Sequence, residues 1–134
     1  MRCLGVDLGD ARTGLALSDP LGVICSPLEV VEERDRDRLL LRIVEAAKEN
    51  GAGKIVVGLP RSLRGGANAQ ADRVLLFVEA LTAAAGIAVD TWDERFTSRM
   101  AEAHGTRGKS QDAVAACYML QNYLDARANM RGEE

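Results

Sequence analysis

The sequence predicts an α/β protein, with one mixed β-sheet and helices on both of its faces. Three β-like runs follow one another at the N-terminus without an intervening helical pattern, which indicates an antiparallel meander. Farther along the chain, short apolar runs alternate with amphipathic patterns, which indicates parallel strands joined by helices. The chain has 134 residues, enough for one core but not for two, so residues 1–134 are expected to form a single domain.

The meander is predicted from its turns. Arg2 to Leu8 and Thr13 to Ser18 are separated by the turn-rich tetrapeptide Gly9-Asp10-Ala11-Arg12, so these two runs are expected to form a hairpin. The third run, Gly22 to Val31, contains Pro27. Because proline has no backbone N–H to donate to a neighbouring strand, this run is expected at a sheet edge or a strand end.

Helices and parallel strands follow the meander. Apolar residues at helical spacing, followed by a glycine, predict a helix from about Asp35 to Asn50. Lys54 to Leu59 is an almost wholly apolar run, which favours a central parallel strand covered on both faces. The later patterns predict a helix that ends before Gly86, a strand over Ile87 to Trp92, a short helix from Thr97 or Ser98 through Ala103, and a last helix from Ser110 or Gln111 to about Ala126.

Charge and composition narrow the possible functions. The net charge of −3 and the pI near 5.3 exclude a uniformly basic nucleic-acid-binding surface, so any phosphate-binding face must be local. No apolar run reaches the roughly 18 residues of a membrane span, and Asp7 puts a carboxylate where a signal peptide would need its apolar stretch. A cytoplasmic protein without a membrane partner is therefore expected. Cys3, Cys25 and Cys117 fit no zinc-binding spacing and are expected to be buried free thiols.

Three carboxylates are candidates for a catalytic centre. Asp7 ends the first strand, Glu94 follows the fifth strand, and Asp112 begins the last helix, where the small residues Ala115 and Ala116 would let the helix approach the sheet. If the three side chains converge, a hard divalent cation is needed to offset their repulsion, so Mg²⁺ or Mn²⁺ is expected, with two ions during catalysis. Such a centre cleaves phosphodiester bonds.

Each carboxylate also has a structural interpretation. Asp7 could hydrogen-bond the turn at Gly9 or form an ion pair with Arg12, either of which would stabilise a charge at a strand end. Glu94 could pair with a following arginine. Asp112 could complement the dipole and the free N–H groups of the helix that it begins.

Two basic segments are candidates for binding substrate phosphates. Arg61 and Arg64 lie in a glycine-containing loop directly after the apolar strand, and guanidinium groups match the geometry of phosphate. Arg95, Arg99, Arg107 and Lys109 form the second segment, of which Arg95, Arg99 and Lys109 are the candidate phosphate contacts. The alternative interpretation of both segments is a solvated connector or helix face.

Four stretches of the sequence combine into a family pattern: LGVDLGDARTGLALSD, KIVVGLPRSLRGG, DERFTSRMAEA and QDAVAACYMLQNYLD. Together they resemble the YqgF family of pre-16S rRNA nucleases, also described as Holliday-junction-resolvase-like proteins. The resemblance implies an RNase H-like fold, a bacterial cytoplasmic setting and a metal-dependent nuclease that removes the 5′ extension of precursor 16S ribosomal RNA. Asp7, Glu94 and Asp112 match the acidic positions of the family's motifs. The segment between Ser98 and Asp112 is shorter than the family's Lys- and Arg-rich loop.

Several functions stay open at this point. The first is an endonuclease that acts on precursor 16S rRNA within a ribosomal particle, as a monomer or weak homodimer. The second is a Holliday junction resolvase, which needs a dimer because two DNA strands must be cut. The third is a non-catalytic nucleic-acid-binding or transcription-associated protein, which would leave the acids without a purpose. The stretch GVDLGDARTG also resembles the phosphate loop of sugar-kinase and actin-like ATPases, which need a second lobe to enclose the nucleotide.

Overall fold

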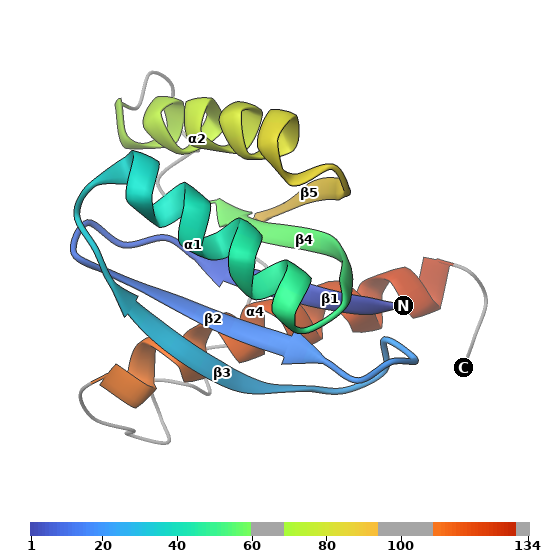
Figure 1. Cartoon of the computed structure of the whole chain (residues 1–134). Coiled ribbons are helices and arrows are strands. Elements are labelled where there is room, and N and C mark those ends of the chain that lie inside the picture. The colour runs from blue at the N-terminus through green and yellow to red at the C-terminus, as the bar shows by residue number, and fades with distance from the viewer. Residues whose placement is uncertain (60–68, 94–108, 131–134) are drawn as a thin grey trace.

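A five-stranded sheet with strand order β3-β2-β1-β4-β5 lies at the centre of the computed structural model (Figure 1). The structure describes residues 1–59, 69–93 and 109–130, so the short helix predicted through Ala103 lies outside it. The elements are β1 (Arg2–Asp7), β2 (Arg12–Ser18), β3 (Cys25–Glu32), α1 (Arg36–Glu49), β4 (Ala52–Leu59), α2 (Ala69–Ala85), β5 (Ala88–Asp93) and α4 (Lys109–Met130). β1, β2 and β3 pair antiparallel and β1, β4 and β5 pair parallel, which confirms the predicted mixed sheet.

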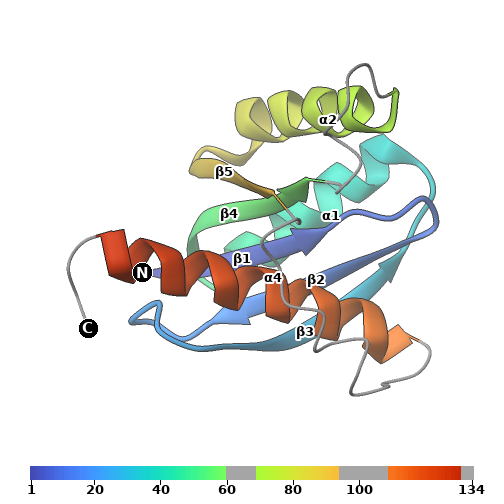
Figure 2. The same ribbon diagram turned by 180° about the vertical axis from the view of Figure 1, so that it is seen from behind.

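Helices cover both faces of this sheet, as predicted. Figure 1 shows α1 and α2 on one face, and Figure 2 shows α4 running across the other. The alternation of side chains along β1 explains the two layers, because Leu4 and Val6 belong to the core under α1 and α2 while Cys3 belongs to the core under α4. Among the described residues, no helix is long and apolar enough to cross a membrane.

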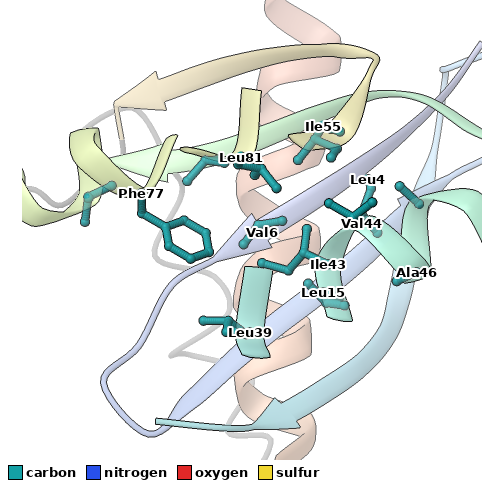
Figure 3. Close-up of a cluster of buried hydrophobic side chains, with 14 residues drawn as sticks. Leu4, Val6, Leu15, Leu39, Ile43, Val44, Ala46, Ile55, Phe77 and Leu81 are labelled. Atoms are coloured by element: carbon teal, nitrogen blue, oxygen red, sulfur yellow. The ribbon is translucent and has the colours of Figure 1, made fainter. Parts of the chain in front are cut away.

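The larger core lies between the sheet and helices α1 and α2 (Figure 3). Leu4, Leu15, Ile43, Ile55 and Leu81 are fully buried there and come from strands and helices far apart in the sequence. Each such side chain contributes roughly 1.5–3 kcal/mol when it leaves water. This layer therefore holds β1, β2 and β4 in fixed positions relative to one another.

The bounds of α1 follow from its caps. The side chain of Asp35 accepts hydrogen bonds from the backbone N–H groups of Asp37 and Arg38 at 2.9 and 3.1 Å, which satisfies donors that the first turn leaves free. After Asn50, Gly51 has a φ of 67°, a left-handed conformation that glycine adopts at low cost. The helix predicted over Asp35 to Asn50 is thereby confirmed.

The edge strand β3 begins at Cys25, later than predicted. The carboxylate of Asp19 accepts hydrogen bonds from the backbone N–H groups of Val23 and Ile24 at 2.7 and 3.0 Å. These bonds hold the preceding residues in a turn and leave them out of the strand. The edge position that Pro27 predicts is confirmed, because only β2 pairs with β3 among the described strands.

The C-terminal helix is longer than predicted, since α4 continues to Met130 and does not end near Ala126. Arg127, in this last part, lies 5.5 Å from the centre of the Tyr123 ring and 3.9 Å from the carboxylate of Asp90 on β5. Apolar periodicity does not reveal such contacts. They give the polar end of the helix a partner on the sheet.

The prediction that all cysteines are buried free thiols is only partly correct. Cys3 is buried, whereas Cys25 on β3 and Cys117 on α4 are partly exposed, and their Sγ atoms lie 3.1 Å apart. α4 packs against β3, so it brings together two residues that are distant in sequence.

Tyr123 connects the middle of α4 to β4 and β5. Lys54 Nζ donates a hydrogen bond to the Tyr123 hydroxyl at 3.0 Å, and the hydroxyl donates to Asp90 Oδ2 at 2.8 Å. Burial of the phenol and its hydrogen bond to the Asp90 carboxylate raise the pKa of Tyr123 above its usual value.

The raised pKa of Tyr123 predicts a loss of stability in alkali. Below about pH 10 the hydroxyl is protonated in both states, whereas above it the unfolded chain loses this proton first, so the free energy of unfolding falls by up to about 1.4 kcal/mol per pH unit. In urea unfolding between pH 8 and 11, Tyr123→Phe should show a shallower decline than the wild type. Tyr118→Phe, the matched control, should follow the wild type. Parallel curves for Tyr123→Phe and wild type would contradict this role of Tyr123.

Candidate active site

The carboxyl ends of three parallel strands form the edge at which the candidate site lies. β1, β4 and β5 run parallel, so Asp7, Leu59 and Asp93, their last residues, lie at the same edge of the sheet. Ligands of open α/β sheets bind outside such edges. The candidate acids Asp7 and Glu94 are therefore at, and directly after, the ends of two of these strands.

Asp7 lies on the face of β1 that α4 covers. Two residues earlier, a Cβ atom added to Gly5 would lie 2.9 Å from Cβ of Leu120 on α4, and Cys3 packs in the same layer. Because strand side chains alternate, Asp7 shares this face with Cys3 and Gly5. Its side chain is partly buried.

Gly14 brings the first turn of α4 to Asp7. Gly14 is the direct partner of Asp7 in the antiparallel pair of β1 and β2, and a Cβ atom on Gly14 would overlap the carbonyl oxygen of Asp112. Directly paired residues point to the same side of a sheet. The backbone of Asp112 therefore rests on the sheet immediately beside Asp7, and the two acids lie at one corner.

Asp112 carries a carboxylate oxygen that is only partly satisfied. Arg12 Nε lies 3.3 Å from Asp112 Oδ2, yet this shielded oxygen accepts no hydrogen bond from the residues that the structure describes. The ion pair is partly open to solvent, with side-chain exposures of 50% for Arg12 and 33% for Asp112, so it contributes about 0–1 kcal/mol at most. A shielded carboxylate oxygen with free lone pairs is a suitable ligand for a hard cation.

The contacts of Arg12 and Asp112 test part of the structural interpretations given above for these acids. Arg12, which the sequence offers as a partner for Asp7, forms an ion pair with Asp112. Asp112 does lie in the first turn of α4, as the dipole interpretation requires. The contact with Gly14 also places the backbone of Asp112 beside Asp7. An acid that served only to complement the helix dipole would not need this placement.

Most of the other candidate residues lie outside the part that the structure describes. These are Glu94, Arg61, Arg64, Arg95 and Arg99, together with the side chain of Lys109 at the start of α4. Within residues 1–59, 69–93 and 109–130, no three acidic, histidine or cysteine side chains gather as a metal site. The two described acids thus form part of the expected set of three.

The contacts of two residues at this corner, Gly14 and Arg12, are not predicted from the sequence. The sequence alone places Gly14 in a strand, and it places Arg12 in a turn or in an ion pair with Asp7. A glycine inside a strand pattern often marks a close approach of another backbone, so Gly14 is a local signal for the contact with α4. The partner of Arg12 had no such signal, because Asp112 is a hundred residues away.

Comparison with known proteins identifies the family. Residues 1–126 match the family model described as RuvX, Holliday junction resolvase. The chain belongs to this family. Similar relatives include proteins of Desulforudis audaxviator (38% identical, covering 98% of this chain and 99% of the relative) and Symbiobacterium thermophilum (38% identical, covering 96% and 94%). Both carry the name "Putative pre-16S rRNA nuclease". The predicted YqgF-family membership is confirmed, and the RuvX family is one of nucleases, so the chain is classed as a hydrolase.

Solved structures of other proteins share the fold of this chain. RuvC of Thermus thermophilus aligns with a TM-score of 0.62 and 17% identity over 96% of this chain and 97% of that one. The same protein in complex with a Holliday junction substrate aligns with a TM-score of 0.63 and 20% identity over 95% of both chains. At these identities the likeness concerns the fold alone, and it confirms the RNase H-like prediction.

The contact at Gly14 predicts a specific effect of Gly14→Ala. The added methyl group overlaps the backbone of Asp112, so the first turn of α4 must move away from Asp7. The free energy of unfolding should fall by about 1–3 kcal/mol, as in other overpacked sites, and nuclease activity should fall with it.

Gly53→Ala is the matched control in the same urea unfolding measurement. There the added methyl group meets only the flexible side chain of Met1, which can move aside. Its effect should be small. Equal losses in the free energy of unfolding for the two substitutions would show that the packing of α4 against Gly14 does not determine the position of this helix.

Proposed function

We propose that this chain is a metal-dependent endonuclease that removes the 5′ extension of precursor 16S rRNA, with the whole chain forming one nuclease domain. The observation that carries the proposal is the position of Asp112, whose backbone packs beside Asp7 at the carboxyl edge of the sheet. The name of the two relatives supports precursor 16S rRNA as the substrate, since each relative is 38% identical to this chain over nearly the full length of both chains.

Asp7, Glu94 and Asp112 would hold the metal. Their donor set is all carboxylate oxygen, which suits Mg²⁺ or Mn²⁺ and excludes a soft-metal preference. The shielded Oδ2 of Asp112 fits this role, because Arg12 near it leaves lone pairs free. When bound, a pair of such ions supplies an activated water and stabilises the charge that develops on the leaving oxygen.

The chain's own residues position the substrate and balance charge. Arg12 offsets part of the negative charge of Asp112 before a substrate arrives. Arg61 and Arg64 follow β4, whose end lies at the candidate edge, so they would contact the phosphates of the RNA backbone. Arg95 and Arg99, which follow β5, receive the same role. Lys109, the first residue of α4, is the fifth proposed phosphate contact.

The partner of the enzyme is proposed to be a preassembled ribosomal particle in the cytoplasm. A net charge of −3 favours weak binding to naked RNA, so the particle must present the scissile phosphate. Correct positioning can supply roughly 7–11 kcal/mol of a reaction barrier, which exceeds the loss from a short basic loop. A monomer or weak homodimer is sufficient for a cut in one strand.

A Holliday junction resolvase is the second candidate function. The description of the matching family model favours it, as does the fold shared with RuvC. The same three acids would act, but two active sites must face two DNA strands, which requires a dimer.

Cleavage assays with acid variants test the first proposal. The wild type should cut the precursor 16S 5′ terminus with Mg²⁺ or Mn²⁺, faster in the ribonucleoprotein than in free RNA, and chelator should stop the reaction. Asp7→Asn and Asp112→Asn should lose at least about 100-fold in rate, because metal coordination supplies several kcal/mol of transition-state stabilisation. Asp125→Asn, an exposed aspartate on the same helix, is the matched control and should cut at the wild-type rate.

Thermal unfolding of the same variants separates metal binding from folding. Millimolar Mn²⁺ should raise the Tm of the wild type, since the ion binds the folded state, and should not raise that of Asp7→Asn. Without metal, Asp7→Asn should be as stable as the wild type or more so, because a like charge is removed. Cleavage by Asp112→Asn at the wild-type rate would refute the proposed site. Paired symmetric nicks in a four-way junction with no RNA product would favour the resolvase.

A further inference from the structure

Two thiols from distant parts of the chain touch each other at the opposite end of β3 from the candidate active site. Cys25 opens β3 and Cys117 lies in α4, and their Sγ atoms are 3.1 Å apart across a sequence separation of 92 residues. A disulfide has an S–S length of about 2.05 Å, so the sulfur atoms need to approach by only about 1 Å.

The backbone around the pair is fixed by hydrogen bonds. Gln121, one turn after Cys117, accepts a hydrogen bond from the backbone N–H of Cys25 at 3.0 Å and donates to the carbonyl oxygen of Val23 at 2.8 Å. These two bonds hold the start of β3 against α4. The short distance between the sulfur atoms is therefore a property of the packed fold.

Small reagents can reach the two thiols. Cys25 and Cys117 are both partly exposed and line a surface hollow of about 540 Å³. Val23, Ile24, Tyr118, Gln121 and Asp125 form the rest of its lining. Cys3, by contrast, is buried in the core under α4 with 6% of its surface exposed.

The contact between the two thiols shifts their pKa values in opposite directions. A hydrogen bond from the Cys25 thiol lowers the pKa of Cys117, whereas the same hydrogen bond, burial and the negative charges nearby raise the pKa of Cys25. The thiolate is the form that reacts with oxidants. With the two Sγ atoms 3.1 Å apart, oxidation of either thiol leaves the other within reach, and the lowered pKa of Cys117 makes it the first to react in the scheme below.

We propose that Cys25 and Cys117 form a peroxide-sensitive dithiol site that closes to an intramolecular disulfide between α4 and the edge strand β3. The Cys117 thiolate attacks one oxygen of hydrogen peroxide, the O–O bond breaks, and a sulfenic acid and hydroxide result; the hydroxide takes up the proton that Cys117 released and leaves as water. The Cys25 sulfur then attacks the sulfenic sulfur, the S–O bond breaks, and the released hydroxyl group leaves with the Cys25 thiol proton as a second water. The two thiols are oxidised together by two electrons, and the peroxide is reduced by two.

The disulfide fixes the helix that carries Asp112. Cys117 follows Asp112 by five residues on α4, about one and a half turns, so a covalent link at Cys117 tethers that part of the helix to the sheet. The link also closes a long loop of the chain, which restricts the unfolded state. Oxidation should therefore stabilise the fold.

Peroxide treatment of the full chain tests the proposal. The number of free thiols should fall from three to one, peptide mapping without reductant should recover a Cys25–Cys117 linked peptide, and Tm should rise by roughly 5–15 °C. Dithiothreitol should reverse all three changes. Cys3→Ser should respond as the wild type does, whereas Cys25→Ser and Cys117→Ser should form no intramolecular disulfide and show no rise in Tm.

Other outcomes would overturn the proposal. Linkage through Cys3, covalent dimers in place of the intramolecular link, or conversion of Cys117 to a sulfinic acid with Cys25 left as a thiol would each show that the pair does not close. An unchanged Tm after complete Cys25–Cys117 linkage would show that the disulfide does not staple α4 to β3.

Discussion

The close contact between α4 and the sheet is the constraint on which the candidate site depends. Two glycines make it possible, because Gly5 faces Leu120 and Gly14 faces the backbone of Asp112 with no side chain between them. Every larger residue at Gly14 would push the start of α4 outward. The helix could not otherwise bring a side chain as short as aspartate to the end of β1, where Asp7 stands.

This packing has an electrostatic consequence. Carboxylates at one strand edge repel one another, and the loss of solvent around Asp112 Oδ2 strengthens the effect. Arg12 offsets it only in part, since the ion pair is half exposed. The close contact of α4 with the sheet therefore places the carboxylates of Asp7 and Asp112 at one corner, and the proposed cation site rests on this placement. The proposed nuclease activity rests on this sequence of causes.

Local signals in the sequence predict the elements well, and long-range contacts explain what they miss. Pro27 places β3 at the edge and Asp35 starts α1, because each acts through its own backbone or its nearest neighbours. The Cys25–Cys117 contact has no local signal, since it forms only when α4 packs on β3. For the candidate site, the sequence predicts Asp7, Glu94 and Asp112, but the placement of Asp112 beside Asp7 depends on Gly14, and Glu94 lies outside the described residues.

The most direct test of the account is where a paramagnetic ion binds. In two-dimensional NMR spectra, substoichiometric Mn²⁺ should broaden the backbone amide signals of Asp7, Gly14 and Asp112 before all others in the described chain, and Asp112→Asn should lose most of this broadening. Broadening centred on other acids, such as Asp19 or Asp125, with the signals of Asp7 and Gly14 left sharp, would contradict the claim that Asp7 and Asp112 form one cation-binding corner.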